Sequence, residues 1–245
     1  KAGLTFASTL RSILRQDPDI IMIGEIRDGD TAEIVLRAAL TGHLVLSTMH
    51  TNDSFSAITR LVDLGVPAYL IAASVNAILA QRLVRRLCRC NRQVPISDAD
   101  RERLARMGMK DIGDFRYEPA GCFLCNKTGY QGRVGIYELL ELNESMRGAL
   151  QQDASSDELR ELARGFGFRS MQEEALERIK EGVTTLEEVL MTVPFDTSKK
   201  VKCKGCSHDL SPDFTHCPFC GVPCSGESAP EISGPRIAAE KRKRK

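Results

Sequence analysis

Cysteine pairs are the residues whose type and spacing most directly indicate chemistry in this chain. Eight of the nine cysteines form two sets of four. The sets are Cys88, Cys90, Cys122 and Cys125, and Cys203, Cys206, Cys217 and Cys220. Zinc prefers four thiolates in a tetrahedron, which two close pairs provide once folding brings them together. The spacing therefore predicts two zinc sites, the second of them a zinc ribbon.

The first cysteine set departs from the usual pattern at one pair. Cys88 and Cys90 are separated by a single residue, which changes the geometry of the knuckle without preventing ligation. His208 and His216 lie beside the second set and are expected to be spectators, with replacement of a cysteine that does not reach the metal as the alternative. Cys224 is expected to be a free thiol rather than a fifth ligand. Two metal quartets favour a reducing cytosol over a secreted, disulfide-bonded scaffold.

An acid and an imidazole follow two short apolar stretches. Glu25 comes after 20–23, and His50 and Asn52 come after 44–46. Such apolar runs predict parallel strands buried on both faces, whose carboxyl ends meet at one edge of the sheet. An acid there can hold Mg²⁺, and an imidazole can contact a terminal phosphate. The alternative for Glu25 alone is a surface acid.

The other helices and strands follow from periodicity and capping patterns. His43 is expected to be a turn residue that donates to the backbone, with a direct role as the less favoured alternative. The chain predicts helices over 4–15, from a capping box of Asp30 with Glu33 to Leu40, over 54–64, and from Pro67 to about Arg86.

After residue 87 the residue pattern of the sequence changes. A polar helix is expected near 97–107 and a strand over 134–142, followed by three short helices. Two of these helices carry capping-box patterns. The capping pairs are Ser155 with Glu158 and Thr184 with Glu187.

Composition sets limits on the function. The 245 residues carry a formal net charge of +1, so no overall charge points to nucleic acid. No apolar run approaches the roughly 20 residues of a membrane span. The basic tail, 225–245, is predicted to be disordered, either as a solvated end or as a contact with lipid or nucleic acid.

Two long motifs carry a family resemblance. The segments 17–28 (DPDIIMIGEIRD) and 39–53 (ALTGHLVLSTMHTND) closely resemble the Walker B and His boxes of the secretion ATPases, the GspE/PilB family of hexameric motors. The resemblance extends to about Val193 and implies a RecA-like α/β P-loop NTPase fold. It implies that Glu25 is the Walker B acid and His50 the phosphate-facing residue.

The resemblance also implies roles for further residues, and it implies a set of cofactors. Arg11, Arg15 and Arg27 match arginines that in the family line the nucleotide site or a subunit interface; a solvated face or a structural ion pair is the alternative for each. The family's assembly branch has a four-cysteine metal subdomain where Cys88 to Cys125 fall. The implied cofactors are ATP, Mg²⁺ and Zn²⁺.

One element of the family is missing from this sequence. It contains no Gly-x-x-x-x-Gly-Lys-Ser/Thr loop, which cradles the phosphates. In the family that loop lies upstream of the segment matched here. We therefore expect the C-terminal portion of a longer protein, inactive by itself.

The resemblance implies a function for the intact protein. We expect a cytoplasmic homo-hexamer that hydrolyses ATP to drive type IV pilus assembly or type II secretion, held at the inner membrane through a platform protein. The alternatives are a retraction or conjugation motor and a non-enzymatic zinc-binding adaptor.

The expected domains follow from these motifs. They are the ATPase portion over 1–87, the metal subdomain over 88–142, a helical region over 143–194, the ribbon over 201–224 and the tail over 225–245.

Overall fold

The computed structural model describes residues 6–106, 113–195, 201–210, 214 and 216–223. By its internal contacts the chain divides into two units. The first comprises 1–96 and 111–195, and the second comprises 97–110 and 196–245. The predicted free thiol Cys224, the start of the first helix and the basic tail lie outside the described residues.

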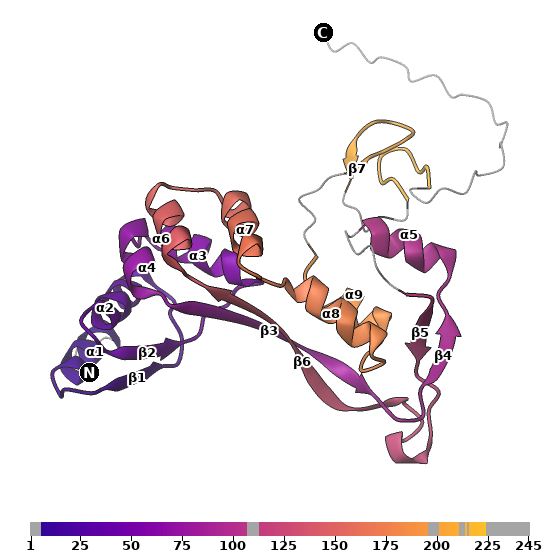
Figure 1. Ribbon diagram of the computed structural model, residues 1–245, viewed down its shortest axis with the longest axis horizontal. Coiled ribbons are helices and arrows are strands. Elements are labelled where there is room, and N and C mark those ends of the chain that lie inside the picture. Colours follow the sequence, from indigo (N-terminus) through magenta and orange to yellow (C-terminus); the bar gives the residue numbers. More distant parts are fainter. Residues whose placement is uncertain (1–5, 107–112, 196–200, 211–213, 215, 224–245) are drawn as a thin grey trace, which may run out of the picture. The chain divides into compact units, whose positions relative to one another are not determined.

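A parallel strand pair opens the first unit. Strands β1 (Ile20–Ile23) and β2 (Leu44–Ser47) pair in parallel, with Ile20 opposite Leu44. Helix α2 (Gly29–Leu40) is the crossover between them, because parallel strands cannot be joined by a tight turn. Figure 1 shows α1 (Phe6–Leu14) and α2 beside this pair. The predicted strand, helix and strand order is confirmed.

Only one face of this strand pair is covered. Leu10 of α1 and Val35 of α2 pack on Ile21 and Ile23. Ile20 and Met22, which point the other way, are 62% and 80% exposed. The expectation of burial on both faces is therefore wrong for the residues described, because alternate side chains of a strand face opposite sides and both helices pack on the same one.

The start of α2 differs from the predicted capping box. Asp28, not Asp30, is the N-cap, and its carboxylate accepts a hydrogen bond from the Thr31 amide at 2.8 Å. Asp30 lies within the first turn, where its charge favours the helix N-terminus. The helix therefore begins two residues earlier than the pattern indicated, at Gly29.

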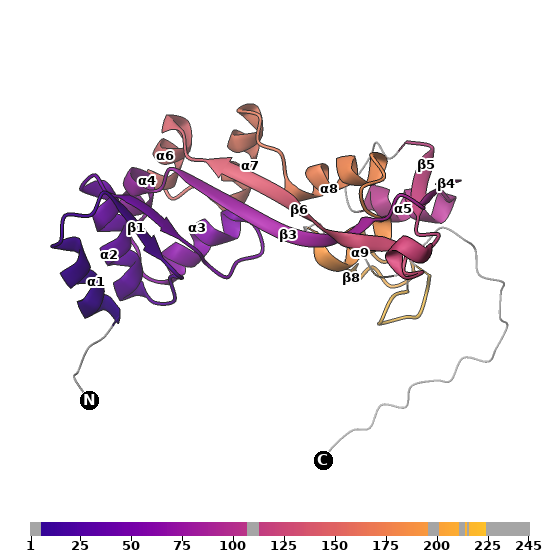
Figure 2. The same ribbon diagram turned by 90° about the horizontal axis from the view of Figure 1, so that it is seen from below.

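The long helix expected from Pro67 is wrong. After α3 (Ser54–Asp63), helix α4 (Ala68–Ser74) ends quickly, and strand β3 (Ala77–Leu87) takes over. β3 pairs antiparallel with β6 (Tyr130–Glu141), as a long two-stranded ribbon visible in Figure 2. Pairing with β6, about 50 residues away, satisfies the backbone hydrogen bonds that a helix would otherwise satisfy locally.

The main core of the first unit lies where the ribbon meets helices α3, α4, α6 (Glu144–Gln151) and α7 (Ser156–Gly165). Phe55 of α3 lies at its centre and is 1% exposed. Its ring meets that of Phe168 edge to face, with 5.2 Å between the ring centroids. The core therefore joins the segment after β2 to the helices at the end of the unit.

Truncating this central ring should be costly. We expect Phe55→Ala to lower the free energy of unfolding by about 3 to 5 kcal/mol, because it leaves a cavity that the surrounding helices cannot fill. The measurement is urea unfolding of the chain. Val62→Ala, on an exposed position of the same helix, is the control and should change it by less than about 0.5 kcal/mol. Equal effects would contradict the assignment of Phe55 to the core.

Two further helices, α8 (Met171–Lys180) and α9 (Leu186–Thr192), complete a set of four rather than the three expected after β6. The predicted capping box of Ser155 with Glu158 is confirmed. The second lies at Ser170 with Glu173, and the cap of α9 is Thr185, not Thr184. Thr184 is buried and donates to the Arg85 carbonyl of β3, so a tertiary contact uses the hydroxyl that the pattern assigned to the cap.

The remaining elements carry the cysteines. In the first unit, β4 (Arg92–Pro95) pairs with β5 (Phe115–Glu118), and the short helix η1 (Phe123–Cys125) precedes β6. The second unit holds α5 (Asp98–Arg106), close to its predicted position, and the strands β7 (Val201–Lys202) and β8 (Asp209–Leu210). Among the residues described, no helix is long and apolar enough to cross a membrane.

Candidate functional site

The loops that follow β1 and β2 are tied together at the carboxyl edge of the strand pair. The Thr48 hydroxyl donates to the Gly24 carbonyl at 2.6 Å, and the Ile26 amide donates to the Thr48 carbonyl at 3.0 Å. These bonds continue the strand pairing beyond its last residues. They bring Glu25, on the first loop, beside the second loop.

Glu25 and His50 meet at this edge. Oε2 of Glu25 lies 3.1 Å from Nε2 of His50. The Glu25 side chain is 26% exposed, whereas that of His50 is 92% exposed. The predicted convergence of an acid and an imidazole at one sheet edge is confirmed, while their chemical roles stay predictions.

Arg27 determines the charge of this acid. Its guanidinium pairs with Oε1 of Glu25 and, as the main cause, lowers the carboxyl's pKa below its usual value. Glu25 is therefore ionised at neutral pH. Its Oε2 is shielded from solvent and accepts no hydrogen bond of good geometry from the residues described. An ionised carboxylate with one oxygen left over fits Mg²⁺, which takes oxygen ligands and keeps several waters.

The other predicted residues of the site lie at varying distances from this pair. Arg11 is on α1 and Arg15 follows it, both with exposed side chains. His43 follows the C-cap of α2, with Nδ1 3.0 Å from the Ala38 carbonyl, as expected for a turn residue. Of the three predicted arginines, Arg27 is the one that the structure brings to Glu25.

An open cleft begins at His50 and follows α3. Its volume is about 620 Å³, and its lining is mostly polar. The lining residues are His50, Thr51, Asn52, Ser56, Thr59, Arg60, Asp63, Arg82, Ser156 and Arg160. The cleft therefore places arginines from three elements near the imidazole.

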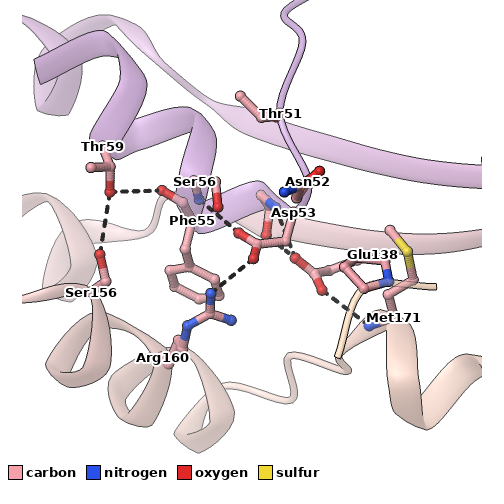
Figure 3. A network of polar contacts seen from close by, with 12 residues as sticks. Thr51, Asn52, Asp53, Phe55, Ser56, Thr59, Glu138, Ser156, Arg160 and Met171 are labelled. Atoms are coloured by element: carbon pink, nitrogen blue, oxygen red, sulfur yellow. Dashed lines mark hydrogen bonds and ion pairs between the residues drawn. The ribbon is translucent and has the colours of Figure 1, made fainter. Parts of the chain in front are cut away.

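Sequence reasoning missed three charged residues that hold this region. Arg82 donates to the loop after β2, and Arg160 pairs with Asp53. Glu138 is buried beneath the start of α3, as Figure 3 shows. A carboxylate inside the apolar stretch 134–142 was a signal for Glu138. Arg82 was hidden by the wrong assignment of its segment to a helix.

The first cysteine set assembles in the loops that follow β3 and β5. All four sulfurs lie within 4.8 Å of one another. The distances Cys88–Cys122 and Cys90–Cys125 are both 3.9 Å, and Cys122–Cys125 is 3.8 Å. Zinc at about 2.3 Å from each of four tetrahedral sulfurs requires sulfurs about 3.8 Å apart. The four thiols therefore fit Zn²⁺, the shortened first pair included.

The second set, in the second unit, also forms one cluster. Its sulfurs lie within 4.8 Å of one another, with Cys203–Cys220 and Cys206–Cys217 both 3.5 Å apart. His208 stacks on the ring of Phe219, with the centroids 4.3 Å apart. The histidine is thus occupied by an aromatic contact, as expected for a spectator.

Backbone amides lower the pKa of one thiol in each cluster. The amides of Cys122 and Gly129 donate to the Cys125 sulfur at 3.1 and 3.2 Å and lower its pKa to about 6. Amides of Cys206 and Gly205 likewise lower the pKa of Cys203 to about 6. A thiolate is the form that ligates metal, so these amides favour it at Cys125 and Cys203, whereas burial raises the pKa of Cys90 and the neighbouring thiols help to raise that of Cys220.

Comparison with known proteins identifies the family. The profile of the family described as "Type II/IV secretion system protein" matches residues 1–191. The chain belongs to this family. The match covers Glu25, His50 and the first cysteine cluster, and it ends before the second cluster.

Relatives within the type II/IV secretion system family are identical to this chain at about half of the aligned positions. The type II secretion system protein HxcR of Pseudomonas aeruginosa is 51% identical over 190 residues, which are 78% of this chain and 37% of that protein. The type IV pilus assembly ATPase PilB of Thermus thermophilus is 48% identical over 194 residues, or 78% of this chain and 22% of that protein. The chain thus spans well under half the length of these relatives.

Solved structures of ATPases have a fold similar to that of this chain. The pilus retraction motor PilT with bound ADP matches 76% of this chain and 43% of its own, with a TM-score of 0.52 and 28% identity. The Legionella pneumophila ATPase DotB matches with the same TM-score at 23% identity, which supports the fold alone. The RecA-like α/β class predicted from the sequence is therefore confirmed.

Proposed function

We propose that this chain is the part of an ATP-hydrolysing motor subunit that carries its catalytic acid, and that the motor drives type IV pilus assembly or type II secretion. The observation that carries the proposal is the contact of Glu25 with His50 at the carboxyl edge of β1 and β2. The names of the relatives that are identical to the chain at about half of the aligned positions support the choice of machine.

The roles of the two residues follow from their charge and exposure. Glu25, kept ionised by Arg27, would hold Mg²⁺ through Oε2 or through a water, and the metal would supply charge neutralisation at the phosphates. His50 points into solvent from the rim of the cleft and can reach a terminal phosphate. There its ring could donate a hydrogen bond to a phosphate oxygen.

The partners that we propose rest on the family. Arg11 and Arg15 are exposed and free to reach a neighbouring subunit of a homo-hexamer. Rings of motor subunits often complete a site with arginines from the next subunit. We propose a cytoplasmic ring that docks on an inner-membrane platform protein. The boundaries at residues 87, 142 and 194 stay predictions; β6, from the proposed metal subdomain, pairs along β3 of the ATPase portion.

A comparison of two samples tests the proposed activity. The chain has no Gly-x-x-x-x-Gly-Lys-Ser/Thr loop, so it should release no phosphate from ATP above background. An intact protein that also carries this loop should hydrolyse ATP when it forms rings. Phosphate release by each sample, with and without Mg²⁺, is the measurement. Turnover by the chain alone, or none by the ring, would contradict the proposal.

We propose that the metal of both cysteine clusters is zinc. The sulfur spacings fit tetrahedral Zn²⁺, and one thiol in each cluster, Cys125 or Cys203, has a pKa lowered to about 6. Metal analysis of the purified chain should find close to two zinc ions per chain. A value of one or none would remove at least one cluster from the assignment.

A retraction motor is the second candidate, because PilT is among the solved structures that match. Its 28% identity is well below the 51% and 48% of the secretion and assembly relatives. Pilus phenotypes of a strain lacking the gene separate the two. Loss of pili supports assembly, whereas retained but non-retracting pili support retraction.

A further inference from the structure

The short segment 50–54, from His50 to the first residue of α3, is held by side chains from three distant elements. His50 itself projects into solvent and touches Glu25. The residues that follow it are anchored from β3, β6 and α7. The anchors from β3 and α7 lie 30 and 107 residues away along the chain from the residues that they contact.

The first anchor is Arg82 of β3. Its Nη2 donates to the Thr51 carbonyl at 3.3 Å and to Oδ1 of Asn52 at 3.2 Å. One guanidinium nitrogen thus holds a backbone and a side-chain oxygen of the two residues next to His50. Because β3 is paired with β6 along its length, this contact attaches the loop to the ribbon.

The second anchor is Arg160 of α7. It pairs with Oδ2 of Asp53 at 3.1 Å and lies over the Phe55 ring, 4.5 Å from its centroid. Oδ1 of Asp53 accepts the Ser56 amide at 2.7 Å as the N-cap of α3. Burial opposes the charge of Asp53, but the Ser56 amide and the Arg160 guanidinium outweigh it and lower the carboxyl's pKa.

The third anchor is Glu138 of β6, which is 2% exposed. Oε1 accepts hydrogen bonds from the Ser54 amide, at 2.9 Å, and from the Ser54 hydroxyl. Oε2 accepts the Met171 amide at 3.0 Å. Ser54 and Met171 are the first residues of α3 and α8, so one carboxylate joins two helix N-termini, where a negative charge is favourable (Figure 3).

We propose that Arg82, Glu138 and Arg160 are positioning residues that hold His50 against Glu25, so that movement of the β3–β6 ribbon or of helices α7 and α8 changes the contact at the nucleotide edge. The catalytic part of this inference rests on the proposed ATPase function. The structural part, that the anchors set the place of the imidazole, does not.

Nuclear magnetic resonance of the histidine rings in the 245-residue chain tests the structural part without ATP. His50→Gln assigns the His50 signals, and Glu25→Gln shows where they lie when the contact with the carboxylate is lost. In Arg82→Ala and Arg160→Ala the signals should move toward the position seen in Glu25→Gln. Arg82→Lys should move them less, because an ammonium keeps donors for both oxygens.

The control is Arg37→Ala. Arg37 also pairs with a carboxylate, that of Glu33 at 2.6 Å, but on the exposed side of α2. It should leave the His50 signals in place. His50 signals at the same positions as in the parent, in both Arg82→Ala and Arg160→Ala, would overturn the proposal. Thermal unfolding checks that both variants are folded.

Turnover by the intact protein tests the catalytic part. Arg82→Ala should lower kcat about 10- to 100-fold, since a small misplacement of a catalytic group has effects of this size. KM for ATP should change less than about threefold, because Arg82 acts through the loop. An unchanged kcat with displaced His50 signals would overturn the catalytic part. If Glu25→Gln turns over ATP as fast as the parent, the proposed function fails instead, and the resonance result still decides the positioning.

Discussion

Glu25→Gln in the intact protein is expected to lower ATP turnover at least about 100-fold, while the affinity for nucleotide stays within a few-fold of the parent. The amide keeps the size of the side chain but removes the charge that Arg27 maintains and the oxygen that would hold Mg²⁺. A group that acts mainly on the transition state lowers kcat without weakening binding, and losses of about 10² to 10⁴ are typical for such groups. Phosphate release and binding of a fluorescent ATP analogue are the two measurements.

Glu33→Gln is the matched control for this substitution. Glu33 is an acid paired with an arginine on an exposed helix face, four residues from its partner, so its loss should leave turnover unchanged. Turnover by Glu25→Gln within a few-fold of the parent would refute the role of Glu25. Loss of nucleotide binding together with turnover would show that it acts in the ground state instead.

Cys125→Ser is expected to remove one of the two zinc ions and to unfold the loops that carry the first cluster. Cys125 is a buried thiol that lies among the other three sulfurs and accepts hydrogen bonds from two backbone amides. Structural zinc contributes roughly 10 to 16 kcal/mol of apparent binding free energy in small domains, so loss of a ligand removes much of what holds the loops together. Zinc content and the rate of proteolysis within 88–96 and 113–129 are the measurements.

The second cluster provides an internal comparison for this prediction. Cys217→Ser should also lower the zinc content by one, but it should leave the first-unit loops at 88–96 and 113–129 resistant to protease, because the two clusters belong to different units. Cys224→Ser, at the ninth cysteine of the sequence, should leave two zinc ions in place. An unchanged zinc content in Cys125→Ser would contradict the first metal site.

Local chemistry was enough to predict the candidate site. A strand that ends in Glu25 and another that precedes His50 have to meet at one edge if a helix crosses between them, since parallel strands align their carboxyl ends. The cysteine spacings likewise predicted both clusters, because each pair closes a knuckle over a few residues and needs the rest of the fold only to bring two knuckles together. These features depend on short segments whose residues act on their neighbours in the chain.

Tertiary structure alone decided the features that depend on distant partners. The segment that contains Arg82 reads as a continuation of the helix after Pro67, but pairing with β6 makes it a strand and turns the arginine toward the loop of His50. Thr184 could not serve as a cap once its hydroxyl reached Arg85. Glu138 joins two helix starts that lie 84 and 33 residues from it.

The difference between the features predicted from the sequence and those decided by the tertiary structure has one physical reason. The sequence by itself determined the strand ends, the crossover helix, the metal quartets and the presence of an acid and an imidazole, because their geometry is set by bonds between near neighbours. Which side chains hold that acid and imidazole in place was decided by the packed structure, since burial of a charge such as Glu138 is favourable only where distant amides and hydroxyls complete its hydrogen bonds.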